Sequence, residues 1–169
     1  KGLEIIEAKT LFNLDVNNIK AIIHRQSKIH AFVEFFDGTV ISHMSNPDMR
    51  IPISYAITYP ERMYSDNKGN FSYENFSFEE VNYDKFPCYR LARKVAEMGK
   101  NTGLILNAAN EISVEYFLED KISYLDIPYI IEDILDASEV VNHDTLDSII
   151  ENDREIRKLT RDYIKTKYS

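Results

Sequence analysis

The Asp37-Gly38 pair near the start of the chain constrains the fold more than any other sequence feature. Asp-Gly is a preferred pair in two-residue hairpin turns, in which both central residues take positive φ values. The flanking runs, residues 32–36 and 39–44, are rich in β-branched and aromatic side chains, as strands are. The pattern predicts two antiparallel strands joined by this turn. Because large apolar side chains occur on both faces of the ribbon, we expect both faces to be at least half covered.

Other segments surround the predicted hairpin. Residues 19–24 form a short apolar run of strand length, so we expect three strands in one small antiparallel or mixed sheet. Apolar residues at three- and four-residue spacings predict a helix over residues 2–12 with one broad buried face. Residues 52–57 are typical of a short helix with proline in its first turn. Residues 63–85 lose all periodicity and predict a linker, whose aromatic side chains should lie against the flanking units.

From residue 86 onward the pattern is helical throughout. Four helices are expected: residues 88–100, residues 107–118, residues 126–137, and a last helix from His143 or Asp144 to about residue 167. The first of them should end at Gly99 or at Gly103, of which Gly103 is the better left-handed cap. Short connections imply an antiparallel bundle. The fold class is therefore α+β: a small sheet with helices over residues 1–62, a linker over residues 63–85 and a C-terminal four-helix bundle over residues 86–169.

Composition narrows the classes of function. The net charge of −8 and the pI near 5.0 argue against nucleic-acid binding, which needs a basic surface to neutralise phosphates. No apolar run approaches the roughly 20 residues that span a bilayer, so we expect a cytoplasmic protein without a membrane partner. The single cysteine, Cys88, excludes an internal disulfide and is expected to be a small buried side chain. Because Lys1 already begins a helical pattern, we expect this chain to be the C-terminal part of a longer protein.

Few residues indicate chemistry by themselves. The sequence contains no HExxH, nucleophile-elbow, P-loop or GxGxxG motif. His24 and His30 flank a polar turn, where the two imidazoles could line one site or could hydrogen-bond to loop backbone. Glu4 lies in the first turn of a predicted helix, where acidic residues favour the positive end of the helix dipole. From these residues alone, both interpretations of the histidines stay open.

Five ordered motifs together carry a resemblance that covers the whole chain. They are KGLEIIEA (residues 1–8), HRQSKIH (24–30), DGTV (37–40), PDMRIPI (47–53) and LNAANEI (106–112). In this order and spacing they closely resemble the family of 1-deoxy-D-xylulose 5-phosphate reductoisomerases. The resemblance implies that the chain corresponds to the second half of the central catalytic domain, the linker and the C-terminal helical bundle of such an enzyme.

The resemblance also implies an activity. Enzymes of this family use NADPH with Mg²⁺ or Mn²⁺ to isomerise and reduce 1-deoxy-D-xylulose 5-phosphate to 2-C-methyl-D-erythritol 4-phosphate in isoprenoid biosynthesis. The implied partners are this phosphosugar substrate and a second copy of the enzyme in a homodimer. The NADPH domain and the remaining metal ligands of the family have no counterpart in this sequence, so we expect the chain alone to be inactive.

By position, the resemblance assigns roles to five residues. Glu4 corresponds to a ligand of the metal ion, and Lys1 corresponds to a lysine that contacts the substrate. Pro47 and Met49 correspond to the wall beneath the bound substrate. His30 corresponds to a histidine beside the reacting groups and is the candidate catalytic residue.

Two positions depart from the family pattern. Arg25 stands where the family commonly has proline in a His-Pro-Gln-Ser motif, and Ala31 stands where it has serine. These departures lower the weight on His24 as a site residue and keep His30 as a secondary candidate.

A function of a different class is a non-catalytic oligomerisation or scaffold module, in which an exposed sheet edge pairs across a dimer axis. The polar residues of the bundle fit either alternative. Asn107, Asn110 and Glu111 share one face of a predicted helix. We predict that they are structural and tie the bundle to the linker or the sheet.

Overall fold

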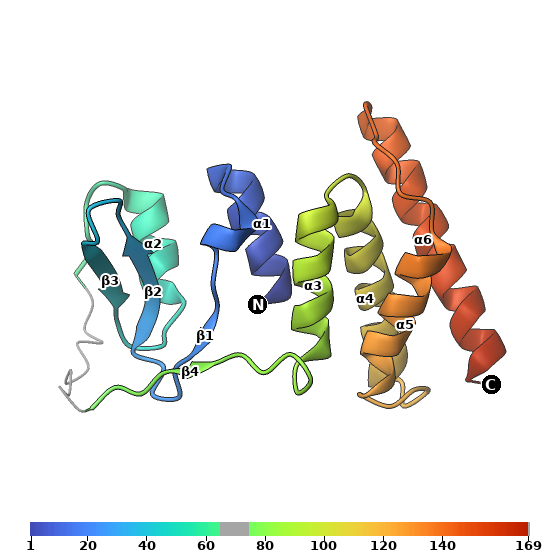
Figure 1. The fold of residues 1–169 in the computed structure, drawn as a ribbon, viewed down its shortest axis with the longest axis horizontal. Helices are drawn as coiled ribbons and strands as arrows, with labels where there is room; N and C mark the ends of the chain where they lie inside the picture. Colours follow the sequence, from blue (N-terminus) through green and yellow to red (C-terminus); the bar gives the residue numbers. More distant parts are fainter. Residues whose placement is uncertain (65–74, 169) are drawn as a thin grey trace. The chain divides into compact units, whose positions relative to one another are not determined.

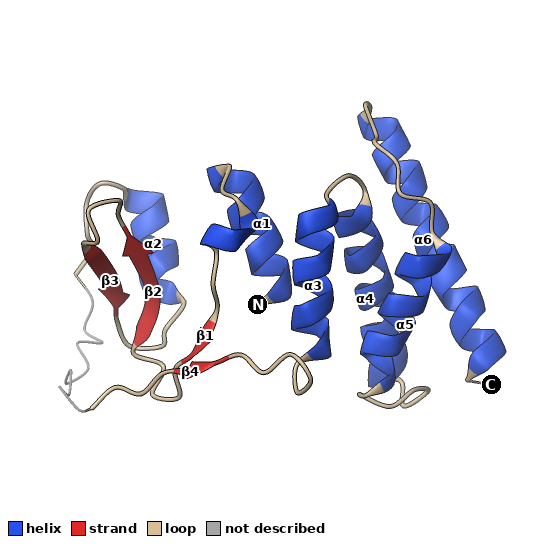
Figure 2. Ribbon diagram, viewed as in Figure 1, coloured by secondary structure: helices blue, strands red, loops and turns tan. Residues whose placement is uncertain are grey.

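The computed structural model describes residues 1–64 and 75–168 and shows an α+β chain (Figures 1 and 2). The chain divides into two compact units. The helical unit combines Lys1–Ala21 with Asn82–Ser169, and the hairpin unit comprises Ile22–Val81. None of the helices among the described residues is long and apolar enough to cross a membrane. The domain boundaries expected after residues 62 and 85 refer to a longer enzyme and stay a prediction.

Helices build the whole of the helical unit. They are α1 (Gly2–Phe12), the 3₁₀ helix η1 (Val16–Asn18), α3 (Pro87–Met98), α4 (Thr102–Leu118), α5 (Asp126–Ala137) and α6 (Leu146–Lys167). Helix α4 packs against α3, α5 and α6, and α5 also contacts α3 and α6. These four helices form the predicted bundle, and α1 packs against α3.

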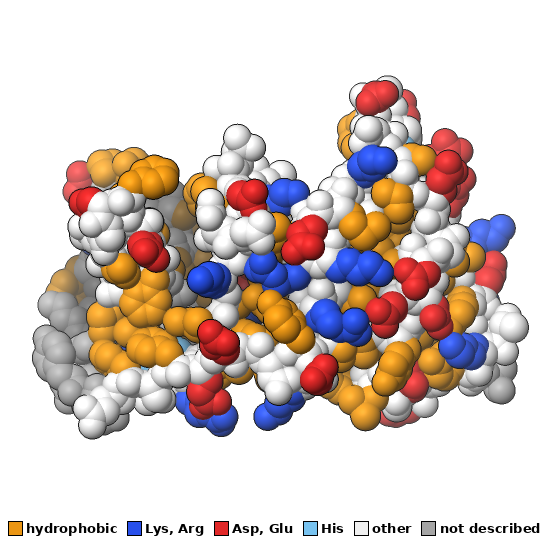
Figure 3. Space-filling view, in the orientation of Figure 1, with side chains coloured by type: hydrophobic (Ala, Val, Ile, Leu, Met, Phe, Trp, Pro, Cys, Tyr) orange, Lys and Arg blue, Asp and Glu red, His pale blue; other side chains and the backbone are white. Residues whose placement is uncertain are grey.

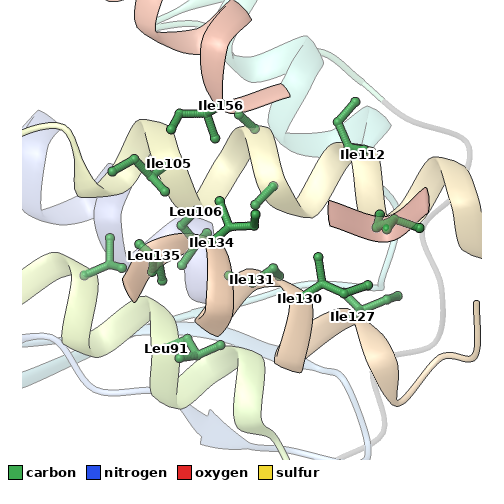
Figure 4. Packing of buried hydrophobic residues seen from close by; sticks show 14 of the residues in the cluster. Leu91, Ile105, Leu106, Ile112, Ile127, Ile130, Ile131, Ile134, Leu135 and Ile156 are labelled. Carbon is green, nitrogen blue, oxygen red and sulfur yellow. The ribbon is translucent and has the colours of Figure 1, made fainter. Parts of the chain in front are cut away.

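The core of the bundle is aliphatic. Figure 4 shows one cluster to which all four helices contribute, for example through Leu91, Ile105, Ile134 and Ile156. Each of these side chains is at most 5% exposed. Burial of a side chain of this kind stabilises the folded state by about 1.5–3 kcal/mol, so this cluster is the main source of stability in the helical unit.

The boundary between α3 and α4 differs from the prediction. Helix α3 ends at Met98 with Gly99 at φ 66° as its cap, and α4 begins at Thr102 rather than at residue 107. Of the two predicted caps, Gly99 is the one observed, and Gly103, the preferred one, lies inside α4. The Thr102 hydroxyl shares its one proton between the carbonyl oxygens of Gly99 and Val95, at 2.6 and 3.1 Å. These bonds fix the turn at Gly99, and the next helix can start directly after it.

Two smaller expectations in the bundle are also wrong. Cys88 is exposed rather than buried, because the core-facing side of α3 begins with Tyr89. The last helix is capped by Thr145 rather than by His143 or Asp144, since the Thr145 hydroxyl accepts a hydrogen bond from the Ser148 amide at 3.2 Å.

Helix α1 approaches α3 closely. A Cβ atom on Gly2 would lie 2.5 Å from the Cβ atom of Ala92, so the absence of a side chain on Gly2 permits this approach. Ile5 is the only buried residue of α1, which the structure describes in full. Leu11 and Phe12 are 77% and 71% exposed. The helix therefore has its predicted bounds, but the prediction of a broad buried face is wrong within this chain.

The hairpin unit is built mostly from strands. Its described residues contain β1 (Ile22–Ile23), β2 (Ile29–Glu34), β3 (Val40–Met44), α2 (Arg50–Thr58) and β4 (Glu79–Glu80). Strands β2 and β3 pair antiparallel, with Val33 opposite Ile41, which confirms the predicted hairpin. Strand β1 pairs with β4 instead of joining this sheet, so the predicted three-stranded sheet is wrong. The guanidinium of Arg25 binds both carboxylate oxygens of Glu79, at 2.6 and 3.1 Å, and this contact holds β4 beside β1.

The turn of the hairpin has three residues rather than two. Gly38 has φ 81°, whereas Asp37 does not take a positive φ. The Phe35 amide donates to the Thr39 carbonyl oxygen at 2.9 Å, and the Gly38 amide donates to the Phe35 carbonyl oxygen at 2.9 Å. The Asp37 carboxylate accepts a hydrogen bond from the Thr39 amide at 2.9 Å and so stabilises the turn without a positive φ.

The hairpin unit contains no buried residue in the part that the structure describes. Val33 and Ile41, which face each other across the hairpin, are 54% and 57% exposed. Figure 3 shows hydrophobic side chains gathered over the hairpin. The expectation that both faces of the ribbon are covered is therefore not met within this chain.

Three aromatic residues of the predicted linker lie against neighbouring rings. In the hairpin unit, Phe78 stacks on His24 with ring centroids 4.9 Å apart, and Phe76 meets the same ring edge-on at 5.6 Å. In the helical unit, Tyr83 stacks on Tyr89 at 5.6 Å. Tyr64 is 76% exposed, whereas Phe71 and Tyr73 lie outside the described residues.

Candidate functional site

Lys1 and Glu4 meet at the start of α1 in the helical unit. The Lys1 Nζ atom lies 2.5 Å from Glu4 Oε2, and the two side chains are 75% and 55% exposed. The hydrogen bond from Lys1 lowers the pKa of the Glu4 carboxyl below its ordinary value. Glu4 is therefore a carboxylate anion at neutral pH, and solvent can reach it.

The Glu4 carboxylate has the chemistry of one ligand for a hard divalent cation, because Mg²⁺ and Mn²⁺ prefer oxygen donors. Within residues 1–64 and 75–168, no three His, Cys, Asp or Glu side chains lie close enough to hold a metal ion. Glu4 fits as a single member of a metal site, and the other ligands would have to come from outside the described chain. The Lys1 ammonium group occupies Glu4 Oε2, so a metal ion that binds this oxygen must displace it.

His30 lies at an irregularity of the hairpin. Ile29 pairs with Met44 and Ala31 pairs with His43, so His30 is the extra residue of a β-bulge. Bulges of this kind redirect a side chain and are common next to active sites. The His30 Nε2 atom lies 3.0 Å from the carbonyl oxygen of Ser45. Because a carbonyl oxygen only accepts, Nε2 carries the proton, and Nδ1 is the nitrogen that could exchange a proton with a ligand in the neutral ring.

Pro47 and Met49 lie in the turn that leads from β3 into α2. Met49 directly precedes α2 and is 71% exposed. The Asp48 carboxylate accepts a hydrogen bond from the Arg50 amide at 3.0 Å and three from the Arg50 guanidinium at 2.6–3.0 Å. The turn thus has a fixed polar side, and its two apolar residues are open to solvent. Sequence reasoning missed Lys28, which donates to the Asn46 Oδ1 atom at 3.0 Å in this turn.

His24 has different surroundings. Its Nδ1 atom lies 3.0 Å from the carbonyl oxygen of Ser77, and its ring is stacked on Phe78. Its Nε2 atom is enclosed and has no hydrogen-bond partner among the described residues. Of the two interpretations left open by the sequence, a bond to loop backbone therefore holds for both His24 and His30. Of the two histidines, His30 is the one bonded to the turn that leads to Met49, through the Ser45 carbonyl oxygen.

The polar face of α4 connects helices of the bundle. Asn107 donates to Glu111 at 3.0 Å, and the Arg157 guanidinium of α6 lies 2.7 Å from Glu111 and 2.7 Å from Asp153. In the described part of the chain, the Asn110 side chain makes no hydrogen bond. Glu111 thus ties α4 to α6 through Arg157. Among the described residues, the bonds of this face do not reach the linker or the sheet, so that part of the expectation is wrong.

Comparison with known proteins identifies the family. The family model of the DXP reductoisomerase C-terminal domain matches residues 44–159. The chain belongs to this family. The match includes the Met49 turn, the helices α2 to α5 and most of α6.

Curated relatives match almost the entire chain. A 1-deoxy-D-xylulose 5-phosphate reductoisomerase of Chloroherpeton thalassium is 44% identical over 165 residues, which are 96% of this chain and 42% of the relative. The enzyme of the same name from Pelotomaculum thermopropionicum is 43% identical over 165 residues, with 94% and 42% coverage. The chain therefore spans less than half the length of these reductoisomerases.

Solved structures of the family share the fold. The reductoisomerase of Zymomonas mobilis in complex with NADPH superposes with a TM-score of 0.86 at 34% identity and covers 96% of this chain and 44% of its own. A DOX-P reductoisomerase in complex with NADPH, fosmidomycin and magnesium gives a TM-score of 0.88 at 36% identity, with 97% and 43% coverage. At these identities the likeness extends beyond the fold to the sequence.

Proposed function

We propose that this chain is the C-terminal part of a cytoplasmic, homodimeric enzyme that converts 1-deoxy-D-xylulose 5-phosphate to 2-C-methyl-D-erythritol 4-phosphate with NADPH and Mg²⁺ or Mn²⁺. The observation that carries the proposal is the identity of 44% over 165 residues with a named reductoisomerase. The exposed, ionised Glu4 carboxylate supports it, because the reaction needs an oxygen ligand for a hard cation.

In this proposal, Glu4 supplies one oxygen ligand to the metal site, and Lys1 turns from Glu4 to an anionic oxygen of the substrate. When bound, the divalent cation polarises substrate oxygens and stabilises the negative charge that develops on them. Lys1 is suited to its role because it is 75% exposed and already neutralises a carboxylate at this place.

The hairpin unit has its own proposed role, which is to contribute apolar shape to substrate binding. Pro47 and Met49 offer apolar surface beneath the substrate, and this surface excludes water from the reacting carbons. The Nε2 atom of His30 is bonded to the Ser45 carbonyl oxygen. Its Nδ1 atom is therefore available to form a hydrogen bond with the substrate or to exchange a proton with it. No residue of this chain is proposed to bind NADPH, and the chain alone is expected to be inactive.

A hybrid enzyme tests the proposal. Residues 1–169 replace the matching C-terminal part of the Chloroherpeton thalassium enzyme, and substrate-dependent NADPH oxidation is measured with Mg²⁺. We expect turnover in the hybrid. Glu4→Gln should lower it at least about 100-fold, since loss of groups that only support metal ligands already costs about 10- to 100-fold. Glu7→Gln, an exposed carboxylate one turn along α1, is the matched control and should leave turnover unchanged.

The outcomes of this test are distinct. A folded hybrid that binds NADPH but shows no turnover contradicts the proposed function. Equal rates for the Glu4 and Glu7 variants contradict the role of Glu4 alone.

The scaffold alternative rests on a specific observation, namely the unpaired outer edges of β2 and β3 in the described sheet. It requires that these edges associate without catalysis. A catalytically inactive hybrid that still forms dimers in analytical ultracentrifugation would favour it.

A further inference from the structure

The turn between β3 and α2 alternates between anchored and exposed residues. Ser45, Asn46 and Asp48 are half-buried, whereas Pro47 and Met49 are exposed. The anchored residues carry the polar groups, and the exposed residues are the apolar ones. A turn of this kind presents an apolar surface from a fixed base.

Lys28 fixes the first half of the turn. This residue precedes β2, and its Nζ atom donates a hydrogen bond to Asn46 Oδ1 at 3.0 Å. Its backbone carbonyl oxygen accepts a hydrogen bond from the Ser45 amide at 3.0 Å. Further along the turn, the Asp48 amide donates a hydrogen bond to the Asn46 carbonyl oxygen at 2.8 Å. Lys28 therefore holds the two residues that come immediately before Pro47.

Arg50 fixes the second half. Its amide and guanidinium all bond to the Asp48 carboxylate, and the Ile51 amide donates to the Asp48 carbonyl oxygen at 3.1 Å. Hydrogen bonds thus fix the residues on either side of Pro47 and of Met49 in the sequence. The conformation of the turn is set before any ligand arrives, and such preorganisation lowers the entropy that binding would otherwise cost.

These bonds do not serve a hydrophobic core, because the described part of the hairpin unit has no buried residue. They also do not neutralise charge at Lys28, whose partner among the described residues is an amide oxygen rather than a carboxylate. The hydrogen bond between Lys28 and Asn46 instead keeps the turn in one conformation. None of the residues that make this tie is assigned a role by the family resemblance.

We propose that Lys28 and Asn46 are positioning residues, which hold the turn so that Met49 and Pro47 fit the substrate. The inference rests on the proposed function, in which this turn lies beneath the bound phosphosugar. Neither side chain needs to touch the substrate, since both act through the backbone of the turn.

The test uses the hybrid enzyme described above. Lys28→Met keeps the length and the apolar stem of the side chain and removes the donor. We expect the KM for 1-deoxy-D-xylulose 5-phosphate to rise about three- to tenfold, as for the loss of one hydrogen bond, while kcat changes less than about twofold. Lys20→Met is the matched control, because Lys20 is an exposed lysine of the helical unit, and it should leave KM unchanged.

Variants of the partner separate a specific tie from a general loss of stability. Asn46→Ala should raise KM as much as Lys28→Met does, and the double variant should be no worse than either single one. Asn46→Asp keeps the acceptor oxygen and should retain the KM of the unsubstituted hybrid. Hydrogen exchange of a peptide that covers residues 45–51 should accelerate in Lys28→Met and in Asn46→Ala only.

Each result decides a separate point. If the unsubstituted hybrid is active and Lys28→Met lowers the melting temperature without a change in KM, the positioning role is wrong and the proposed function stands. If the unsubstituted hybrid folds but has no turnover, the proposed function fails, and the positioning role fails with it. Additive effects of Lys28→Met and Asn46→Ala would show that the two residues do not act through one bond.

Discussion

The helical unit and the hairpin unit of this chain are held together by different interactions. All buried residues of the described chain lie in the helical unit, where Ile105 and Ile130 are 0% exposed. In the hairpin unit, Val33 and Ile41 stay more than half exposed, and polar contacts such as the pair of Arg25 and Glu79 hold the segments. One unit is therefore stabilised by an apolar core, and the other takes its geometry from individual hydrogen bonds.

The residues proposed for function lie outside the apolar core. His30 and Met49 belong to the hairpin unit, and Glu4 lies on the exposed first turn of α1. A close-packed core leaves no room for a ligand, whereas exposed polar groups on a fixed backbone can reach one. Under the proposed function, the exposed apolar side chains of β2 and β3 are surfaces for the remainder of a longer enzyme.

Removing a core side chain should give the largest difference between the units. Ile130→Ala deletes a side chain that is 0% exposed in α5 and should lower the free energy of unfolding by about 2–5 kcal/mol, because a cavity remains. Ile41→Ala, at a side chain that is 57% exposed in β3, should change it by less than about 0.5 kcal/mol. Urea unfolding followed by circular dichroism checks both. Equal losses would mean that the hairpin packs as tightly as the bundle.

A smaller effect is expected at the edge of the helical unit, where α1 meets α3. Gly2→Ala places a Cβ atom 2.5 Å from Ala92 Cβ, so the helices must separate, at a cost of about 1–3 kcal/mol. Gly103→Ala is the matched control, since its nearest neighbour, Ile6 Cγ2, is at 3.7 Å. That change should be neutral or should stabilise α4 by up to about 1 kcal/mol. Thermal unfolding of both variants gives the comparison, and stabilisation by Gly2→Ala would contradict the close packing of α1.

Sequence reasoning worked best where structure depends on neighbouring residues. The bounds of α1 and α5 agree with the predicted helices over residues 2–12 and 126–137, because the apolar spacing within each segment specifies them. It failed where distant residues decide. The partner of β1 is β4, which lies in a segment without periodicity, and the pairing depends on contacts such as that of Arg25 with Glu79. Nothing in either segment alone encodes this pairing.

The candidate site shows the same limit. The motifs pointed to Glu4 and Met49, and the structure places both side chains at exposed positions. The β-bulge at His30 and the bond from Lys28 to Asn46 were not predicted. Both depend on the register between β2 and β3, and a register is a relation between two strands rather than a property of either one.

The smallest expected effect concerns a polar contact of the helical unit. In this unit, burial of apolar side chains should contribute more to stability than hydrogen bonds do. The Asp133 carboxylate of α5 accepts hydrogen bonds from the Tyr163 hydroxyl and, at 2.9 Å, from the Lys167 ammonium group of α6. These bonds lower the pKa of Asp133 below its ordinary value, and the bond from Tyr163 has the larger effect. Because the carboxyl has a lower pKa in the folded state than in the unfolded state, the resulting stabilisation is present above about pH 4 and is lost as the pH falls through the folded-state value.

Tyr163→Phe removes the first of the two donors and keeps the ring. We expect the pKa of Asp133 to rise toward its ordinary value while the bundle stays folded at neutral pH. The acid-dependent loss of stability should become smaller, because the folded and unfolded pKa values move closer together. NMR titration of the Asp133 carboxyl carbon measures this shift, and Tyr129→Phe, at a side chain of α5 that is 62% exposed, is the control that should not move it. An unchanged Asp133 pKa in Tyr163→Phe would assign the effect to Lys167. Unfolding of that variant at neutral pH would instead show that the helical unit depends on polar contacts as much as the hairpin unit does.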